Sequence, residues 1–165
     1  MGHDGFEGLC RDHYASVVRT VYLITGDRQE ALDIAQEAFA RAFERWRTVA
    51  ALDRPEAWVH HVAANLARSW WRRRRVRRNV AAPSPPDLPE PHPPDLALMT
   101  ALRSLTPAQR TAVVLRFYGD WSIVDVAKTL GKSPGTVRAL TSQGVARLRE
   151  LLGAEREEVS DEDAR

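Results

Sequence analysis

The sequence of 165 residues contains a single cysteine, Cys10, which excludes an internal disulfide and a cysteine-based zinc cluster. It contains no apolar run near the ~20 residues that a membrane-spanning helix needs. Its first ten residues also lack the basic and apolar regions of a secretion signal. We therefore expect a cytoplasmic protein with no membrane insertion.

Motifs for metal, cofactor or nucleotide chemistry are missing as well. The sequence has no HExxH and no G-x-G-x-x-G, and the string GKS that begins at Gly131 lacks the upstream glycine of a phosphate-binding loop. His60 and His61 are adjacent, so on a helix their side chains point ~100° apart and cannot share a metal ion. The sequence predicts no enzyme, no metal site and no cofactor.

Prolines are concentrated in one segment, which divides the chain. Seven of the ten prolines lie in residues 79–95. Because proline fixes φ and has no N–H donor, this segment is expected to be extended rather than packed. Basic residues outnumber acidic residues on both sides of it, which favours a polyanionic partner. We expect two domains, residues 1–78 and 96–152, an acidic Pro-rich linker over 79–95, and a disordered acidic tail over 153–165.

Hydrophobic spacing before the linker predicts three helices. The first covers about residues 6–25 and places Cys10 on its apolar stripe, which indicates a structural role for the thiol. The second begins at Asp27, with Glu30 three residues on in a capping-box arrangement. One face of the second helix is predicted to carry Leu32, Phe39, Phe43 and Trp46. Its other face, most simply a solvated surface, carries Asp33, Gln36, Glu37, Ala40 and Glu44.

The third helix is predicted to begin after Pro55 and to end near Arg75. At ~100° per residue, one arc collects the apolar side chains Trp58, Val59, Val62, Ala63, Leu66 and Trp70. The opposite arc collects His61, Asn65, Arg68, Arg72 and Arg75. Guanidinium groups in register on a stiff helix suit phosphates and base edges, because their forked donors bind both. A basic solvated helix end, or nucleic-acid binding without sequence preference, remains an alternative reading of this arc.

The segment after the linker predicts a helix-turn-helix. Thr106, Pro107 and Gln109 form a capping box at the start of one helix, which should end at Gly119. Ser122 caps a helix that ends at Leu130. Ser133 caps the next helix, which should continue to about Leu152. A small residue at the helix crossing, a turn glycine and an apolar residue on the second helix are what this motif requires. Ala127, Gly131 and Val137 stand at these places.

The second helix of such a motif enters the major groove by its N-terminal end. Arg138 is the best candidate for a guanine edge or a phosphate. Ser133 and the first backbone amides suit a phosphate. The residues predicted to reach DNA are Ser133, Thr136, Arg138, Ala139, Ser142 and Gln143.

Taken together, the two halves resemble a bacterial RNA polymerase sigma factor, in particular the compact extracytoplasmic-function (ECF) branch. The string DIAQEAFARAF is similar to the core-binding helix of that family. PEAWVHHVAANLARSWWRRRR is similar to its −10 promoter helix, and LTPAQRTAVVLRFYGDWSIVDVAKTLGKSPGTVRAL is similar to its −35 domain. The resemblance implies an all-α fold of two small helical domains and a protein that directs promoter-specific transcription initiation.

The resemblance also implies partners and contact residues. Core RNA polymerase would be bound through the clamp helices of its β′ subunit by Asp33, Gln36, Glu37 and Phe39. The −10 promoter DNA would be bound by His61, Asn65, Arg68, Arg72 and Arg75, with a base captured by the loop at residues 49–54. The −35 DNA would be bound by the residues predicted above for the groove-entering helix. An anti-sigma factor is a partner that the family allows and that no residue of this sequence specifies.

One other binding function remains open at this point. A helix-turn-helix regulator that acts without polymerase would bind a palindromic site as a dimer. It would leave the DIAQEAF face and the Asn–Arg arc unexplained.

The sequence departs from the family's pattern where relatives carry serine and arginine, which are replaced by Ala139 and Gln143. Losing a cation from the groove-entering helix removes a phosphate contact and weakens the salt dependence of DNA binding. We predict that Gln143→Arg steepens the slope of log K against log salt by about 1. Titrating −35 DNA at several salt concentrations measures this slope, and an unchanged slope would contradict the prediction.

Overall fold

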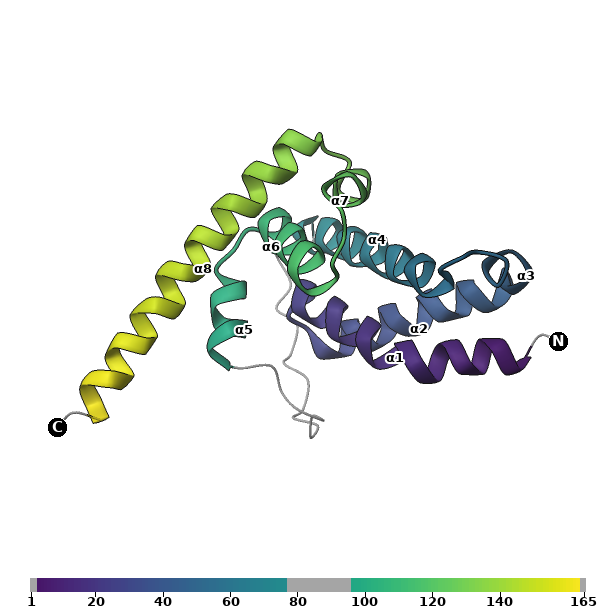
Figure 1. Cartoon of the computed structure of the whole chain (residues 1–165), viewed down its shortest axis with the longest axis horizontal. Coiled ribbons are helices and arrows are strands. Elements are labelled where there is room, and N and C mark those ends of the chain that lie inside the picture. Colours follow the sequence, from purple (N-terminus) through teal and green to yellow (C-terminus); the bar gives the residue numbers. More distant parts are fainter. Residues whose placement is uncertain (1–2, 77–95, 164–165) are drawn as a thin grey trace. The chain divides into compact units, whose positions relative to one another are not determined.

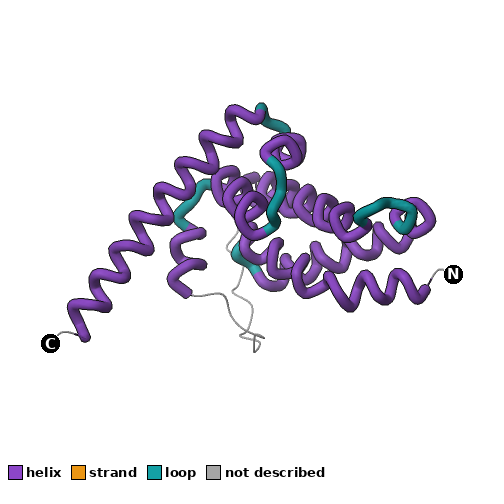
Figure 2. The backbone as a smooth tube through the Cα atoms, viewed as in Figure 1, coloured by secondary structure: helices purple, strands orange, loops and turns teal. Residues whose placement is uncertain are grey.

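The computed structural model describes residues 3–76 and 96–163, which are helices joined by short loops and turns (Figures 1 and 2). The chain divides into two compact units, residues 1–83 and 84–165. No β-strand occurs in the described ranges. The expectation of an all-α protein with two helical domains is confirmed.

The first unit contains α1 (His3–Thr25), α2 (Arg28–Glu44), the single turn α3 (Trp46–Val49) and α4 (Pro55–Val76). Helices α1, α2 and α4 pack against one another pairwise (Figure 1). Gly26, at φ 71°, ends α1 in the left-handed region that favours glycine. Asp27 then caps α2, because its side chain accepts a hydrogen bond from the Glu30 amide at 3.1 Å.

Small side chains dominate the contact face of α2, which differs from the prediction. The predicted face included Phe43, yet this ring is 51% exposed, and Leu32 is only half-buried. Alanine leaves room for neighbouring helix backbones to approach closely, so a face rich in alanine becomes the interior. The buried residues of α2 are Ala31, Ile34, Ala35, Ala38, Phe39 and Ala42.

The buried arc of α4 is likewise rotated toward its alanines. Trp58, Val62 and Leu66, predicted for the core, are only half-buried. The buried residues of α4 are Val59, Ala63, Ala64, Ala67 and Trp70. The helix therefore packs through a narrower and smaller face than hydrophobicity alone indicated, and its broad outer face keeps Asn65 and the arginines exposed.

The second unit contains α5 (Leu96–Arg103), α6 (Pro107–Val113), η1 (Val114–Tyr118), α7 (Ile123–Leu130) and α8 (Pro134–Asp163). The predicted helix from Pro107 to Tyr118 is present, with its last turn wound as a π-helix. The predicted capping box is formed in full by Thr106 and Gln109.

Helix α8 extends beyond the predicted end near Leu152 and continues to Asp163. The commonest residue of the extension is glutamate, and alanine and arginine occur beside it. These residues have high helix propensity, so a sequence that looked like a disordered tail continues the helix.

Gly144 allows α8 to cross α6 at close range. A Cβ at this position would lie 2.7 Å from Val113 Cγ2 and 3.6 Å from Gln109 Cβ and Leu105 Cδ1. Val113 and Leu105 are themselves buried. Sequence reasoning did not assign this role to Gly144.

We predict that Gly144→Ala destabilises the protein by about 1–2 kcal/mol, because overpacking costs ~1–3 kcal/mol and the gain in helix propensity offsets only part of it. Gly153→Ala is the matched control on the same helix, since nothing lies within 4 Å of the added methyl group. The control should gain up to about 1 kcal/mol. Denaturant unfolding measures both values, and equal stability of the two variants would contradict the packing role of Gly144.

Candidate functional sites

Helices α7 and α8 form the predicted helix-turn-helix. Ser122 caps α7 through a hydrogen bond from the Asp125 amide to its Oγ at 3.1 Å. Gly131 lies at φ 62° and makes the turn. Ala127 is 5% exposed, and Val137 is fully buried against the rest of the unit. The three residues assigned to the motif thus occupy the crossing, the turn and the interior.

The N-terminal end of α8 presents the predicted DNA-facing residues to solvent. Ser133 Oγ accepts a hydrogen bond from the Thr136 amide at 3.1 Å and lies 2.9 Å from Thr136 Oγ1. Ser133 is therefore a helix cap, whose hydroxyl is already engaged. Lys132, which sequence reasoning did not single out, is an exposed cation in the turn beside it. The exposed predicted residues are Ser133, Thr136, Arg138, Ala139, Ser142 and Gln143.

Gln143 is tied to the start of α6, an arrangement that the sequence did not predict. Its Oε1 accepts a hydrogen bond from Gln109 Nε2 at 3.2 Å. The sequence predicted the part of Gln109 in the capping box. It did not predict the contact with Gln143, because 34 residues separate the two glutamines.

The outer face of α4 carries the predicted Asn–Arg arc. Asn65, Arg68, Arg72 and Arg75 are exposed, whereas His61 is half-buried. The arc therefore forms one face with His61 at its less accessible end.

Two side chains near the end of α4 fasten it to the turn between α1 and α2. Trp71 Nε1 donates a hydrogen bond to the carbonyl oxygen of Ile24 at 3.2 Å. Arg74 lies 5.0 Å over the Trp70 ring, and its Nη1 is 3.9 Å from Asp27 Oδ2. Arg74 thus differs from its neighbours in the arginine run, because it packs against the bundle. Sequence reasoning missed this anchor.

The acidic face of α2 is exposed at Asp33, Gln36 and Glu37. Gln29 Nε2 donates to Asp33 Oδ1 at 3.0 Å, and Arg41 Nε pairs with Glu37 Oε1 at 2.7 Å. Exposed pairs of this kind contribute little to stability, so these groups remain accessible to a partner.

Phe39, predicted as both core and interface, lies in the core with 5% of its surface exposed. Its ring centroid is 5.5 Å from that of Tyr14 and 6.5 Å from that of Phe6. The Phe39 ring packs inside the bundle and offers almost no surface to a partner. Phe43 on the same helix is exposed instead.

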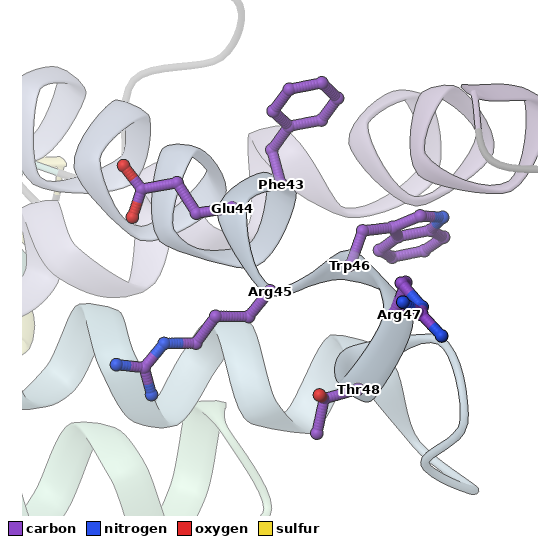
Figure 3. A pocket seen from close by; sticks show the side chains of 6 residues that line it. All are labelled: Phe43, Glu44, Arg45, Trp46, Arg47 and Thr48. Carbon is purple, nitrogen blue, oxygen red and sulfur yellow. The ribbon is translucent and has the colours of Figure 1, made fainter.

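An open depression of about 570 Å³ surrounds the break between α2 and α3 (Figure 3). The side chains of Phe43, Glu44, Arg45, Trp46, Arg47 and Thr48 line it. Figure 3 shows these side chains diverging from the backbone rather than converging on one point. The arrangement suits contact with a large partner surface better than capture of a small molecule.

His60 lies on the inner side of α4, against α1. Its Nε2 is 3.3 Å from Ser16 Oγ, which in turn donates to the carbonyl oxygen of His13. Burial lowers the pKa of His60, and positive charge on His13, His61 and Arg54 acts in the same direction. The carboxylate of Glu56 opposes this shift. His60 is therefore a packing residue held in its neutral form.

Two further observations concern membrane-spanning helices and the cysteine. The described helices include none long and apolar enough to cross a membrane. Burial, together with Glu7, raises the pKa of the Cys10 thiol. A raised pKa disfavours the reactive thiolate and agrees with a structural role for Cys10.

Comparisons with known proteins agree with this geometry. Residues 9–77 match Sigma-70 region 2, and residues 95–148 match Sigma-70, region 4. The RNA polymerase sigma-E factor of Streptomyces antibioticus is 34% identical over 164 residues, which cover 97% of this chain and 88% of that protein. The ECF RNA polymerase sigma factor SigL of Mycobacterium tuberculosis is 30% identical, and the match covers 87% of this chain and 86% of that protein.

A solved structure shares the fold. The sigma factor RpoE from Bartonella quintana, crystallised with the anti-sigma factor NepR, matches with a TM-score of 0.73 at 23% identity. The match covers 90% of this chain and 97% of that chain.

Two helical units, one ending in an exposed arginine face and the other containing a helix-turn-helix, define a two-domain transcription factor. The chain belongs to the sigma-70 family of RNA polymerase sigma factors, in its ECF branch. Its function is to direct transcription initiation with RNA polymerase, and the regulator that acts alone is not favoured.

The lowered pKa of His60 predicts a pH-dependent stability. Between the folded and unfolded pKa values the unfolded chain binds more protons, so stability is fully present above about pH 6.5, the unfolded value, and falls as pH drops through the folded value. We predict that His60→Gln flattens the dependence of unfolding free energy on pH between about 7.5 and 5.5. His61→Gln, on the outer side of the same helix, is the matched control and should keep most of the dependence, because the charge on His61 is a minor cause of the lowered pKa of His60. Equal pH profiles for both variants would contradict this assignment.

Proposed function

We propose that this sigma factor binds its three partners, core RNA polymerase, −10 DNA and −35 DNA, through three separate exposed faces. The acidic face of α2 binds the clamp helices of the β′ subunit of RNA polymerase. The outer face of α4 binds −10 promoter DNA, and the N-terminal part of α8 binds −35 DNA. The observation that carries the proposal is that each face is polar and exposed while the apolar sides of the same helices are buried.

The polymerase-binding face consists of Asp33, Gln36 and Glu37. Its support is the unbroken exposure of these positions on one side of a helix whose other side is packed with alanines. The exposed Phe43 ring adds an apolar contact at the end of the same helix. A few polar groups beside a single aromatic side chain are a common composition for a protein interface.

The −10 face consists of Asn65, Arg68, Arg72 and Arg75, with His61 at its edge. Exposed guanidinium groups in register supply phosphate contacts, and Asn65 supplies the amide that base-edge recognition requires. The loop before α4 lies beside the start of this helix and is exposed from Ala50 to Arg54. We assign the capture of an unstacked base to this loop.

The −35 face consists of Ser133, Thr136, Arg138, Ala139, Ser142 and Gln143. Its support is the helix-turn-helix geometry together with the exposure of these residues at the start of α8. The α8 amides that follow Ser133 favour a phosphate, and Arg138 favours a guanine edge or a second phosphate.

We infer that tight selection of a promoter depends on both DNA faces binding together. Joining two weak sites makes the second binding step intramolecular and raises its effective concentration. Spacing between the −10 and −35 elements thereby becomes part of specificity. The predicted linker, with Asp87, Glu90 and Asp95, lies outside the described residues.

Regulation by an anti-sigma factor is also part of the proposal. The support is the structural match to RpoE, which was solved in complex with NepR. An anti-sigma factor that covers one of these polar faces would block the binding of polymerase or DNA.

We further propose that the protein acts by binding alone and catalyses no reaction. Its site of action is the bacterial cytoplasm, where promoter DNA and polymerase are found.

Run-off transcription with core RNA polymerase tests the proposal. The chain should direct initiation from particular promoters on genomic fragments, which core polymerase alone does not do. We predict that the double variant Asp33→Ala, Gln36→Ala loses co-purification with core polymerase and most of this activity, while its thermal unfolding is unchanged because both residues are exposed.

Glu7→Ala, Asp12→Ala is the matched control, since both residues are exposed on α1. This control should keep both binding and transcription. Equal binding of core polymerase by the two double variants would refute the assigned face. Tight selection of a DNA site by the chain without polymerase would refute the proposed mechanism as a whole.

A further inference from the structure

Two glutamines link the start of α6 to the DNA-facing helix. Gln109 is the third residue of α6 and closes the capping box with Thr106. Its side chain also reaches Gln143 on α8, where Nε2 of Gln109 lies 3.2 Å from Oε1 of Gln143. Gln143 is exposed, and Gly144 beside it provides the close approach of α8 to Gln109 and Val113.

The orientation of both amides follows from one backbone donor. The Thr106 N–H can only donate, and it lies 3.2 Å from the Gln109 side chain, so the atom that faces it must be Oε1. The Gln109 atom that faces Gln143 is therefore Nε2, which can only donate. The Gln143 atom that receives this bond must in turn be Oε1.

One end of the Gln143 amide is thus occupied and the other is available. Within the part of the chain that the structure describes, no hydrogen bond engages Nε2 of Gln143. The exposed end of this side chain therefore offers N–H donors, while its acceptor is turned toward α6.

We propose that Gln109 is a positioning residue that sets the base preference of the −35 domain by holding Gln143 as a hydrogen-bond donor. The inference rests on the proposed role of α8 in −35 recognition. A glutamine that is free to present both atoms reads adenine, because it accepts from N6 and donates to N7. A glutamine that presents only donors matches the acceptors of guanine, N7 and O6, or the O4 of thymine.

Gln109→Glu should reverse this polarity without disturbing the helix start. Glutamate is the usual residue at the third position of a capping box, so the bond from the Thr106 amide is kept. Both carboxylate oxygens accept, so the remaining oxygen requires a donor from Gln143. The Gln143 amide must then flip, which exposes Oε1 together with one N–H and creates the pair that adenine needs.

The test uses the full chain bound to core RNA polymerase and a library of promoters with a randomised −35 element. Comparison of the wild type with Gln143→Ala should identify one base position where the variant loses the preference for guanine or thymine. At that position, Gln109→Glu should raise the adenine share relative to guanine by about fivefold or more, the lower end of what a bidentate amide–adenine pair contributes. The added negative charge weakens binding to all sequences alike, so it does not imitate a change in preference at one position.

A second variant separates positioning from stability. Gln109→Met removes both side-chain hydrogen bonds and frees the Gln143 amide, so its preference should broaden to include adenine without excluding guanine. Thermal unfolding of both variants reports any loss of structure.

Three results would overturn the inference. The first is an identical preference profile for the wild type and Gln109→Glu, and the second is a profile in which no position responds to Gln143→Ala. Either would leave the proposed function intact if initiation stays promoter-specific. The third, complete absence of promoter selection by the wild-type chain, would refute the proposed function as well.

Discussion

Close helix packing through small residues decides which side chains remain available for binding. In the first unit, alanines of α2 and α4 fill the space between the helices. In the second unit, Gly144 brings α8 against α6. Small residues at these crossings bury one narrow face of each helix, and the wider remaining face is left to polar and charged groups. Every exposed polar face described above is what this packing leaves outside.

In both units, caps and turns fix where individual helices begin and end. Asp27, Thr106, Ser122 and Ser133 each accept a backbone hydrogen bond at a helix start. Gly131 reverses the chain between α7 and α8. These elements are local, and the orientation of each helix comes from its packing against the other helices of its unit.

Much of this arrangement was predictable from the sequence because its signals are local. Capping boxes, turn glycines and the Ala127, Gly131 and Val137 spacing gave the helix-turn-helix, and the exposed arc of α4 followed from helical periodicity. Hydrophobicity failed where small residues formed the core, so Phe43 was placed inside although it is exposed.

Contacts between distant residues carried no sequence signal. The bond between Gln109 and Gln143, the bond from Trp71 to the Ile24 carbonyl, and the need for glycine at position 144 all depend on tertiary packing. The end of α8 was misjudged for a different reason. Acidic composition was read as disorder, whereas glutamate, the commonest residue of this segment, favours helix.

The anchor at the end of α4 has a mechanical consequence. Asp27 caps α2 with one carboxylate oxygen, and its other oxygen faces Arg74. Trp71 donates a hydrogen bond to a carbonyl oxygen in the last turn of α1. The corner between the first two helices and the tip of the arginine helix are thereby joined. A force that tilts α2 is therefore transmitted through these contacts to the last turns of α4.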